Sequence, residues 1–263
     1  MSKNIDLSII IVSWNTKDLL DKCLRSVYEN NSQLNLEVFV VDNNSKDQTV
    51  DMVKSKYPLV KLISNNKNLG FAVANNQALK KAQGKYILLL NPDTEILEKA
   101  LERAIEFMAN HLDCGVMGAK LLNTDKTVQF SVRKLPTWWP IFLLLVKAPK
   151  FFKKLKALDD YLCLNFNYNK LQTVEQVMGA FMLMTKKLID EIGLLDERFF
   201  IWFEEVDLCR RALDSGYQVV YNPDIEVLHH GGQSFAQEQI IKKQFIFFKS
   251  AIQYFLKHGF LNK

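Results

Sequence analysis

The sequence contains few cysteines, and their spacing excludes the structures that depend on them. Four cysteines occur in 263 residues, none belongs to a CxxC pair, and they lie far apart, at Cys23, Cys114, Cys163 and Cys209. This pattern is typical neither of a disulfide framework nor of a zinc site. It favours a reducing compartment, so we expect a cytoplasmic protein.

Long hydrophobic runs and targeting segments are also missing. No apolar stretch reaches the roughly 18 residues that a membrane-spanning helix needs. The N-terminal sequence MSKNIDLSIIIVSW lacks the apolar region and the cleavage site of a signal peptide. No repeat, low-complexity stretch or linker rich in proline and glycine divides the chain, so we expect one α/β domain with an elaborated second half.

Glycine-rich phosphate loops are absent as well. Neither a GxGxxG nor a Walker sequence occurs, which argues against dinucleotide enzymes and P-loop NTPases. A nucleotidyltransferase is disfavoured because the N-terminal segment offers no such glycines. The net charge of +5 is mild and suits anionic ligands or an anionic surface, and we expect no nucleic-acid partner.

What the sequence does contain is a set of apolar runs that end in polar residues. The clearest is KYILLLNPDTE, residues 85–95, whose apolar part predicts a strand buried on both faces and whose polar part begins at Asn91. The runs at residues 7–13 and 37–41 end in the same way. Because open α/β sheets bind ligands at the carboxyl ends of their strands, we expect a ligand site at this edge.

The alternation of strands and helices in the first half predicts a parallel sheet with right-handed crossovers. We expect strands at residues 7–13, 37–41, 60–64, 86–90, 114–122, 127–132, 181–185, 217–221 and 225–228. We expect a first helix capped by Thr16, and helices at residues 47–56, 70–84, 96–110, 204–213 and 237–257. We assign an apolar stripe of the last helix to the core: Ile241, Phe245, Phe248, Ile252 and Phe255.

Three groups of polar residues near the predicted strand ends could bind a phosphorylated ligand. Asp93, beside Asn91, can hold a divalent cation against a diphosphate. Asp42 can accept hydrogen bonds from a ribose or a base. Asn68 precedes Gly70 at a predicted helix start, where free N–H groups suit phosphates. For each group, an ordinary turn or helix cap is the alternative.

An acidic cluster and a histidine stand out in the second half. Glu204, Glu205 and Asp207 follow aromatic residues that include Trp202. Aromatic neighbours desolvate an acid and raise its pKa toward the range of a general base, and aromatic faces suit sugar rings. The alternative is capping of the first helical turn. His229 follows a short strand and precedes two glycines closely, so it can reach a metal.

Residues 137–156 form an insertion that is first hydrophobic and then basic. Trp138 and Trp139 open it, and five lysines follow, at positions 147, 150, 153, 154 and 156. Apolar residues beside clustered lysines suit the surface of an anionic membrane. The alternative is a helix that packs on the core and carries a basic outer face.

Together, these segments resemble the inverting family 2 glycosyltransferases of the GT-A fold, especially their rhamnosyltransferase-like bacterial members. Eight motifs occur in register from about Leu7 to Ser234: IIIVSWN, VVDNNS, NKNLGFAVANN, YILLLNPDTE, MGAFMLM, LDERFF, FEEVDLCRR and HHGGQS. The fold implied is a Rossmann-like, mostly parallel sheet flanked by helices, with a small second sheet and a C-terminal helical extension. Its glycosyltransferase domain would cover residues 1–236, divided into nucleotide-binding (1–112) and acceptor-binding (113–236) halves, with a C-terminal helix at 237–263.

The resemblance also assigns site residues. It implies a nucleotide site made of Ser13, Asn15, Asp42, Asn44, Asn68, Gly70 and Asn91. Asp93 falls on the family's DxD motif and would bind Mg²⁺ or Mn²⁺, as would His229, which lies five residues before Ser234. Glu205 would be the catalytic base, and Trp202 and Glu204 would contact the acceptor. Two departures are that Asn91 replaces the first acid of DxD and that Glu205 replaces an aspartate, which lengthens the reach by one methylene.

The implied reaction is metal-dependent, inverting sugar transfer from a nucleotide-diphosphate donor, with dTDP-rhamnose as the best single choice. The implied acceptor is a glycan or a polyprenyl-linked glycan of bacterial cell-surface polysaccharide synthesis, which would place the enzyme at the inner face of the cell membrane. The alternative from another class is a non-catalytic nucleotide-sugar-binding or scaffold subunit of a membrane-associated assembly complex. Whether the chain forms a homo-oligomer is open.

Overall fold

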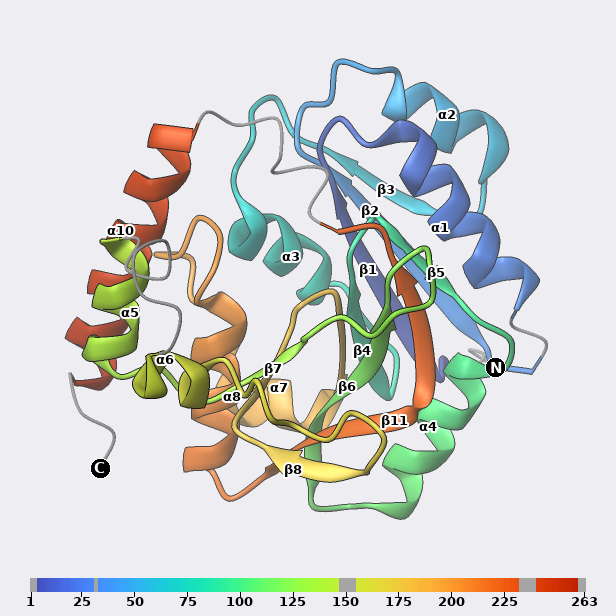
Figure 1. Cartoon of the computed structure of the whole chain (residues 1–263). Coiled ribbons are helices and arrows are strands. Elements are labelled where there is room, and N and C mark those ends of the chain that lie inside the picture. The colour runs from blue at the N-terminus through green and yellow to red at the C-terminus, as the bar shows by residue number, and fades with distance from the viewer. Residues whose placement is uncertain (1–3, 31–32, 147–154, 232–239, 260–263) are drawn as a thin grey trace.

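The computed structural model describes residues 4–30, 33–146, 155–231 and 240–259. Within these residues a central sheet has the strand order β3-β2-β1-β4-β10-β6-β11-β5, with β8 paired to β11, and a second sheet joins β7 and β9 (Figure 1). The strands are β1 (Leu7–Ser13), β2 (Leu36–Asp42), β3 (Lys61–Ser64), β4 (Tyr86–Leu90), β5 (Thr94–Ile96), β6 (Cys114–Leu122), β7 (Val132–Arg133), β8 (Gln172–Val174), β9 (Gln176–Val177), β10 (Phe181–Thr185) and β11 (Gln218–His229). The helices are α1 (Lys17–Glu29), α2 (Thr49–Lys56), α3 (Phe71–Leu79), α4 (Ala100–Asn110), α5 (Trp138–Leu145), α6 (Lys156–Tyr161), α7 (Lys186–Ile192), α8 (Glu204–Asp214) and α10 (Ile240–His258).

Strand β1 is buried along its whole length and runs parallel to β2 on one side and β4 on the other. Its residues Leu7, Ile9 and Ile11 belong to the core shared with α1, α2 and α4. Ile10 and Val12 belong to the core shared with α3, α7 and α8. Since successive strand residues point to opposite faces, a continuous apolar strand needs helices on both faces, and Figure 1 shows them there.

The predicted α/β fold is confirmed, and several strands have the predicted bounds. The strands at residues 7–13, 86–90, 114–122 and 181–185 match residue for residue. The sheet is parallel from β3 to β4 and again between β6 and β11. Strand β10 lies antiparallel between these two parts.

Three predicted strands in the second half are wrong in extent. Of residues 127–132, only Val132 belongs to a strand, and Val128 makes an isolated bridge to Leu122. They follow a turn in which Asp125 accepts hydrogen bonds from the backbone N–H (2.9 Å) and the hydroxyl (2.6 Å) of Thr127. The segments at 217–221 and 225–228 form one strand, β11, whose register against β6 shifts between Asn222 and Glu226. Such a bulge lets one strand bend without breaking.

Two predicted helix ends are also wrong. The side chain of Thr16 does not cap α1, because its hydroxyl pairs with that of Ser13 at 2.9 Å. Helix α3 ends at Leu79, short of Gly84. Gly84 instead allows close approach to β1, since a Cβ there would lie 2.5 Å from the backbone nitrogen of Ser8.

The C-terminal helix α10 lies beside α5 and α6 at one edge of the molecule (Figure 1). Its predicted apolar stripe is core only in part: Phe255 is buried, but Phe245, Phe248 and Ile252 are 67%, 47% and 42% exposed. The side chain of Ile241, residues 237–239 and the lysines at 147, 150, 153 and 154 lie outside the described residues. Among the helices that the structure describes, none combines the length and apolar character needed to cross a bilayer.

Candidate active site

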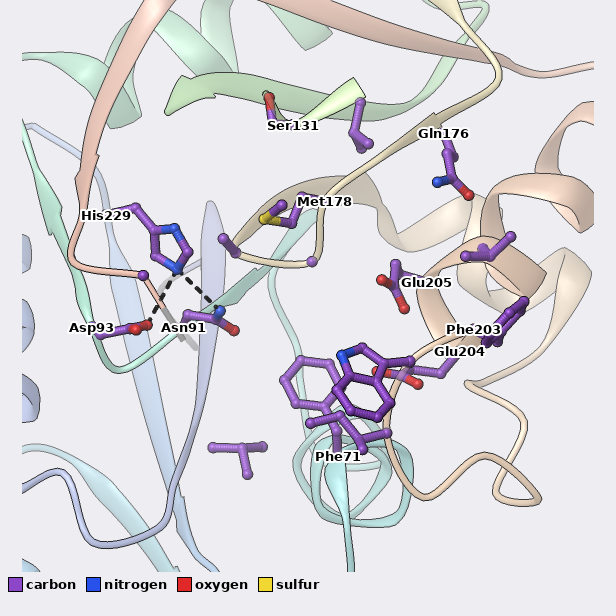
Figure 2. Close-up of a pocket in the computed structure, with 18 of the residues that line it drawn as sticks. Phe71, Asn91, Asp93, Ser131, Gln176, Met178, Phe203, Glu204, Glu205 and His229 are labelled. Carbon is purple, nitrogen blue, oxygen red and sulfur yellow. Dashed lines mark hydrogen bonds and ion pairs between the residues drawn. The ribbon is translucent and has the colours of Figure 1, made fainter. Parts of the chain in front are cut away.

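A cavity of about 690 Å³ lies at the carboxyl ends of β1 and β4, the edge where the strand pattern predicted a ligand site. Eight of the predicted site residues line it: Asn68, Gly70, Asn91, Asp93, Trp202, Glu204, Glu205 and His229. Figure 2 shows Asp93 and His229 on one side of the cavity and Glu205 on the other. The structure therefore brings the predicted metal ligands and the predicted base into one space.

Backbone contacts hold the turn after β4 in place. The N–H of Asn91 donates to the carbonyl of Ala180 (3.0 Å), and the N–H of His230 donates to the carbonyl of Asp93 (2.8 Å). Strand β5 pairs with the end of β11, with Thr94 opposite His229. As a result, His229 Nε2 lies 3.4 Å from Asp93 Oδ1, and both side chains are buried.

Gln129 determines which nitrogen of His229 faces Asp93. Its side-chain nitrogen donates to Asn123 Oδ1 (2.7 Å) and to the backbone carbonyl of His229 (2.8 Å). Because the side-chain nitrogen of Gln129 is used in these two contacts, its Oε1 is the acceptor in the hydrogen bond with His229 Nδ1, at 2.7 Å. A neutral histidine that donates from Nδ1 keeps a lone pair on Nε2, which is the nitrogen beside Asp93.

The chemistry of this pair fits a divalent cation. Carboxylate oxygens bind Mg²⁺ and Mn²⁺, and a neutral imidazole is a common metal ligand. Asp93 Oδ1 and His229 Nε2 are close enough for one ion to contact both. Within the described residues no cluster of three or more histidine, cysteine and acidic side chains is arranged to hold a metal, so further ligands would come from substrate or water.

The acidic pair begins α8, and the chain enters this helix by a strained route. Trp202 and Phe203 have φ angles of 64° and 69°, in the left-handed region that non-glycine residues rarely adopt. Phe247 of α10 packs against both rings, with centroids 5.7 Å and 5.4 Å away. Such strain persists only where the surroundings fix it, and α10 supplies part of that support.

Both acids of the pair are desolvated. Glu204 Oε2 and Glu205 Oε2 are buried and have no hydrogen-bond partner in the described part of the chain. Burial raises the pKa of Glu204 well above its usual value, and the charge of Glu205 raises it further. Burial also raises the pKa of Glu205, but backbone N–H groups and Arg133 oppose this increase. Burial thus disfavours the charged form of both acids, while Arg133 and the backbone N–H groups favour the charged form of Glu205, which suits Glu205 to accept a proton.

The family model described as "Glycosyl transferase family 2" matches residues 8–171. The chain belongs to this family. One relative is the N-acetylglucosaminyl-diphospho-decaprenol L-rhamnosyltransferase of Mycobacterium tuberculosis, 24% identical over 243 residues, which cover 87% of this chain and 77% of the relative. Another is the low-salt glycan biosynthesis hexosyltransferase of Haloferax volcanii, 23% identical over 229 residues, covering 86% of this chain and 67% of the relative. The predicted family and the prediction of an enzyme, a glycosyltransferase, are confirmed.

Solved glycosyltransferases have the same fold. A mannosyltransferase from Pyrobaculum calidifontis, solved with GDP-Man and Mn²⁺, gives a TM-score of 0.67 at 19% identity and covers 100% of this chain and 66% of its own. GalNAc-T7, solved with UDP, GalNAc and Mn²⁺, gives 0.64 at 15% identity and covers 86% of this chain and 43% of its own. The predicted GT-A fold is thus confirmed.

Asp42 of this glycosyltransferase lies at the end of β2 and is almost fully buried. Its Oδ2 accepts from the N–H groups of Asn44 and Ser45, both at 3.1 Å. Its Oδ1 has no partner among the described residues. That oxygen can accept a hydrogen bond from a ligand, although the cavity lining includes the neighbouring Asn43 rather than Asp42.

Three other predicted nucleotide residues are not part of the cavity lining. The hydroxyl of Ser13 pairs with Thr16, Asn15 Oδ1 accepts from the backbone N–H of Lys46 (2.7 Å), and Asn44 Oδ1 accepts from Lys46 Nζ (2.9 Å). The contact of Asn15 to Lys46 joins the loops after β1 and β2, whereas the contacts of Ser13 and Asn44 are local. Nucleotide contact by these three residues stays a prediction.

The free N–H groups predicted at Gly70 are not free. The N–H of Gly70 donates to Asn68 Oδ1 (2.9 Å), and that of Phe71 donates to the carbonyl of Phe200 (2.6 Å). Gly70 has a φ of 83°, and a Cβ there would lie 2.4 Å from the Phe200 oxygen. Gly70 therefore joins α3 to the loop that precedes Glu204, and a phosphate contact by Asn68 or Gly70 stays a prediction.

The predicted acidic cluster separates in the structure. Asp207 is fully buried in an ion-pair network with Arg211 Nε (2.8 Å), Lys257 Nζ (2.6 Å) and His258 Nε2 (2.7 Å). It is not part of the cavity lining. Its role is to attach α10 to α8.

The sequence analysis missed four polar cavity-lining residues in or next to the small sheet of β7 and β9: Gln129, Ser131, Arg133 and Gln176. Gln129, Ser131 and Arg133 alternate along the chain, which is the spacing of one face of a strand, but alternation alone does not reveal that this face lines a cavity. Gln176 joins them through the pairing of β9 with β7, which depends on the fold.

Proposed function

We propose that this glycosyltransferase moves a sugar from a nucleotide-diphosphate donor to a hydroxyl group of a glycan, with inversion at the anomeric carbon. The observation that supports the proposal is the single cavity that contains both the Asp93–His229 pair and Glu205. With the donor diphosphate near Asp93, Glu205 faces the acceptor side. Glu205 takes the proton of the acceptor hydroxyl while that oxygen attacks the anomeric carbon and the bond to the diphosphate breaks.

Asp93 and His229 would hold Mg²⁺ or Mn²⁺ in this reaction. When bound, the ion would neutralise the negative charge that develops on the leaving diphosphate. Gln129 keeps the Nε2 lone pair of His229 directed at the site. Because Asn91 carries no charge where DxD has an acid, the phosphates of the donor contribute a larger share of the negative charge around the ion.

The donor and acceptor follow from the relative in Mycobacterium tuberculosis, whose name specifies L-rhamnose transfer to a diphospho-decaprenol-linked sugar. We propose dTDP-rhamnose as donor and a lipid-linked glycan as acceptor. A thermal-shift screen of nucleotide sugars with and without Mn²⁺ tests the donor, because a ligand that binds the native state raises the Tm. Stabilisation by another nucleotide sugar but not by dTDP-rhamnose would replace this choice.

Glu205→Gln tests the proposed base. We expect donor binding to be unchanged and kcat to fall by about 10²–10⁴-fold, because the amide cannot accept the proton. Glu204→Gln is the matched control, since it makes the same change at the neighbouring buried carboxyl group of the cavity lining and leaves Glu205 in place. Transfer by Glu205→Gln at the wild-type rate would show that another group is the base.

An exposed apolar surface near the cavity supports a membrane-bound acceptor. We call it the apolar edge; its residues are Trp138, Trp139, Phe142, Val146, Phe245, Phe248, Ile252 and Leu256, all at least 42% exposed. The same two segments reach the cavity through Leu144 and Phe247. A lipid-linked sugar could therefore enter the cavity from a bilayer that covers the apolar edge.

The charges beside the apolar edge favour an anionic bilayer over a second copy of the chain. Helix α10 contains no acidic residue, and Lys242 and Lys249 are exposed on it. In a symmetric dimer the same surface would meet itself and bring lysines together, whereas anionic lipid attracts them. Indole rings are also typical of the membrane interface.

Vesicle co-sedimentation tests the apolar edge. We expect the wild type to bind vesicles of phosphatidylcholine and phosphatidylglycerol, and Phe245→Ser/Leu256→Ser to bind at least about tenfold less well, because two exposed apolar side chains lose their contact with lipid. Leu112→Ser is the control, since Leu112 is 85% exposed elsewhere on the surface. Equal binding by both variants, or a dimer that only Phe245→Ser/Leu256→Ser abolishes, would refute membrane contact.

A further inference from the structure

Four buried side-chain atoms of the cavity lining have no hydrogen-bond partner among the described residues. They are Ser131 Oγ, Gln176 Oε1, Glu204 Oε2 and Glu205 Oε2. The two glutamates have a role in the proposed reaction. Ser131 and Gln176 do not, although each is only 5% exposed.

Two buried polar residues elsewhere in the fold, Ser8 and Asn76, show what satisfied side chains look like. Ser8 Oγ, fully buried, bonds to a carboxylate oxygen of Glu37 and accepts from the N–H of Gly84 at 2.8 Å. Asn76, 1% exposed, donates to the carbonyl of Leu195 (2.8 Å) and accepts from the N–H of the same residue (3.1 Å). Because a buried polar group without a partner reduces stability, Ser131 and Gln176 need an explanation outside the fold itself.

The small sheet carries both side chains. Ser131 directly precedes β7, and Gln176 begins β9, where it pairs with Arg133. Figure 2 shows Gln176 near Glu205 and Ser131 on the other side of Met178 from Glu205. A ligand that contacts Gln176 therefore lies next to Glu205, the group proposed to take the proton of the acceptor, and it extends past Met178 to reach Ser131.

We propose that Ser131 and Gln176 form a subsite for the acceptor sugar. The identity of the ligand in this inference rests on the proposed function. The existence of a subsite at Ser131 and Gln176 does not. Gln176 Oε1 needs a donor, and Ser131 Oγ can donate or accept, so a ring with several hydroxyl groups satisfies both. The subsite holds hydroxyl groups adjacent to the one that Glu205 deprotonates, and it therefore selects which hydroxyl is glycosylated.

Thermal unfolding without any ligand tests whether the two polar groups serve the fold. We expect Ser131→Ala and Gln176→Leu to keep or raise the Tm, because each removes a buried group that has no partner. Ser8→Ala and Asn76→Leu are matched controls and should lower the Tm, because they break satisfied hydrogen bonds. A loss of Tm in Ser131→Ala and Gln176→Leu as large as in the controls would overturn the proposal.

Steady-state kinetics test the subsite itself. With dTDP-rhamnose as donor and a short isoprenoid N-acetylglucosaminyl diphosphate as acceptor probe, we expect each variant to raise the acceptor KM about five- to tenfold and to leave the donor KM unchanged. An unchanged acceptor KM in both variants would overturn the subsite. A wild type that does not use the probe would count against the proposed acceptor, and the unfolding experiment would still decide the subsite.

Discussion

Replacing Gly70 by alanine tests how α3 is joined to the loop before Glu204. Gly70 and Gly193 have nearly the same backbone conformation, with φ and ψ of 83° and −178° at Gly70 and of 82° and 178° at Gly193, but only Gly70 has neighbours where a Cβ would be. An alanine in this conformation costs about 1–3 kcal/mol at either position. At Gly70 the new Cβ would also lie 2.4 Å from the Phe200 oxygen and 2.7 Å from its Cδ2, and such overpacking costs a further 1–3 kcal/mol or so.

We therefore expect the free energy of unfolding to fall by about 2–6 kcal/mol in Gly70→Ala and by about 1–3 kcal/mol in Gly193→Ala, measured by urea denaturation. Because Phe200 lies in the loop that leads to Trp202 and Glu204, Gly70→Ala should also lower kcat, by about 10²-fold for a displacement near 1 Å. Gly193→Ala should leave kcat unchanged. Equal losses of stability, with kcat unaffected in both variants, would refute the close contact between α3 and this loop.

Two further predictions concern residues that only the structure identified. Gln129→Leu removes the acceptor of His229 Nδ1, so we expect Mn²⁺ affinity, measured by calorimetry, to fall about 10–100-fold; Gln129→Glu should retain much of it. Unchanged affinity in Gln129→Leu would contradict a metal-binding His229. Arg133→Gln removes a charge that lowers the pKa of Glu205, so that pKa should rise. Since Glu205 must be ionised to act, the acid limb of the kcat/KM profile should move to higher pH, and the rate at low pH should fall about tenfold for each pH unit that the limb moves. An unmoved acid limb would mean that Arg133 does not act on the base.

The parts of the fold that could be predicted from the sequence are those with strong local signals. The runs at residues 7–13 and 86–90 are apolar throughout, and burial on both faces explains why their bounds match the structure. Asp93 could be found because it directly follows such a run. Glu204 and Glu205 could be found because aromatic residues precede them and because the motifs around them resemble a known family.

The parts that could not be predicted depend on contacts between distant segments. The apolar pattern of α10 assigned Phe245, Phe248 and Ile252 to the core, but they are exposed. The buried positions include Ala251, Tyr254 and Phe255, and a helix that is apolar on both faces does not reveal in its sequence which face packs inward. Gln129 was missed because its role exists only through His229, which lies one hundred residues away along the chain.

The antiparallel strands explain why one cavity can contain both halves of the proposed chemistry. The parallel strands β1, β2 and β4 place Asp42 and Asp93 at their carboxyl ends. Glu205 and His229 come from the second half of the chain and must be brought to this edge by other strands. Strand β10 returns antiparallel beside β4 and brings the Ala180 carbonyl to Asn91, and β11 brings the N–H of His230 to the Asp93 carbonyl. The turn that carries Asp93 is therefore hydrogen-bonded to the backbone of the second half of the chain. Because Gly179, next to Ala180, lies close to Glu205, displacement of this segment changes the positions of the proposed base and of Asp93 together.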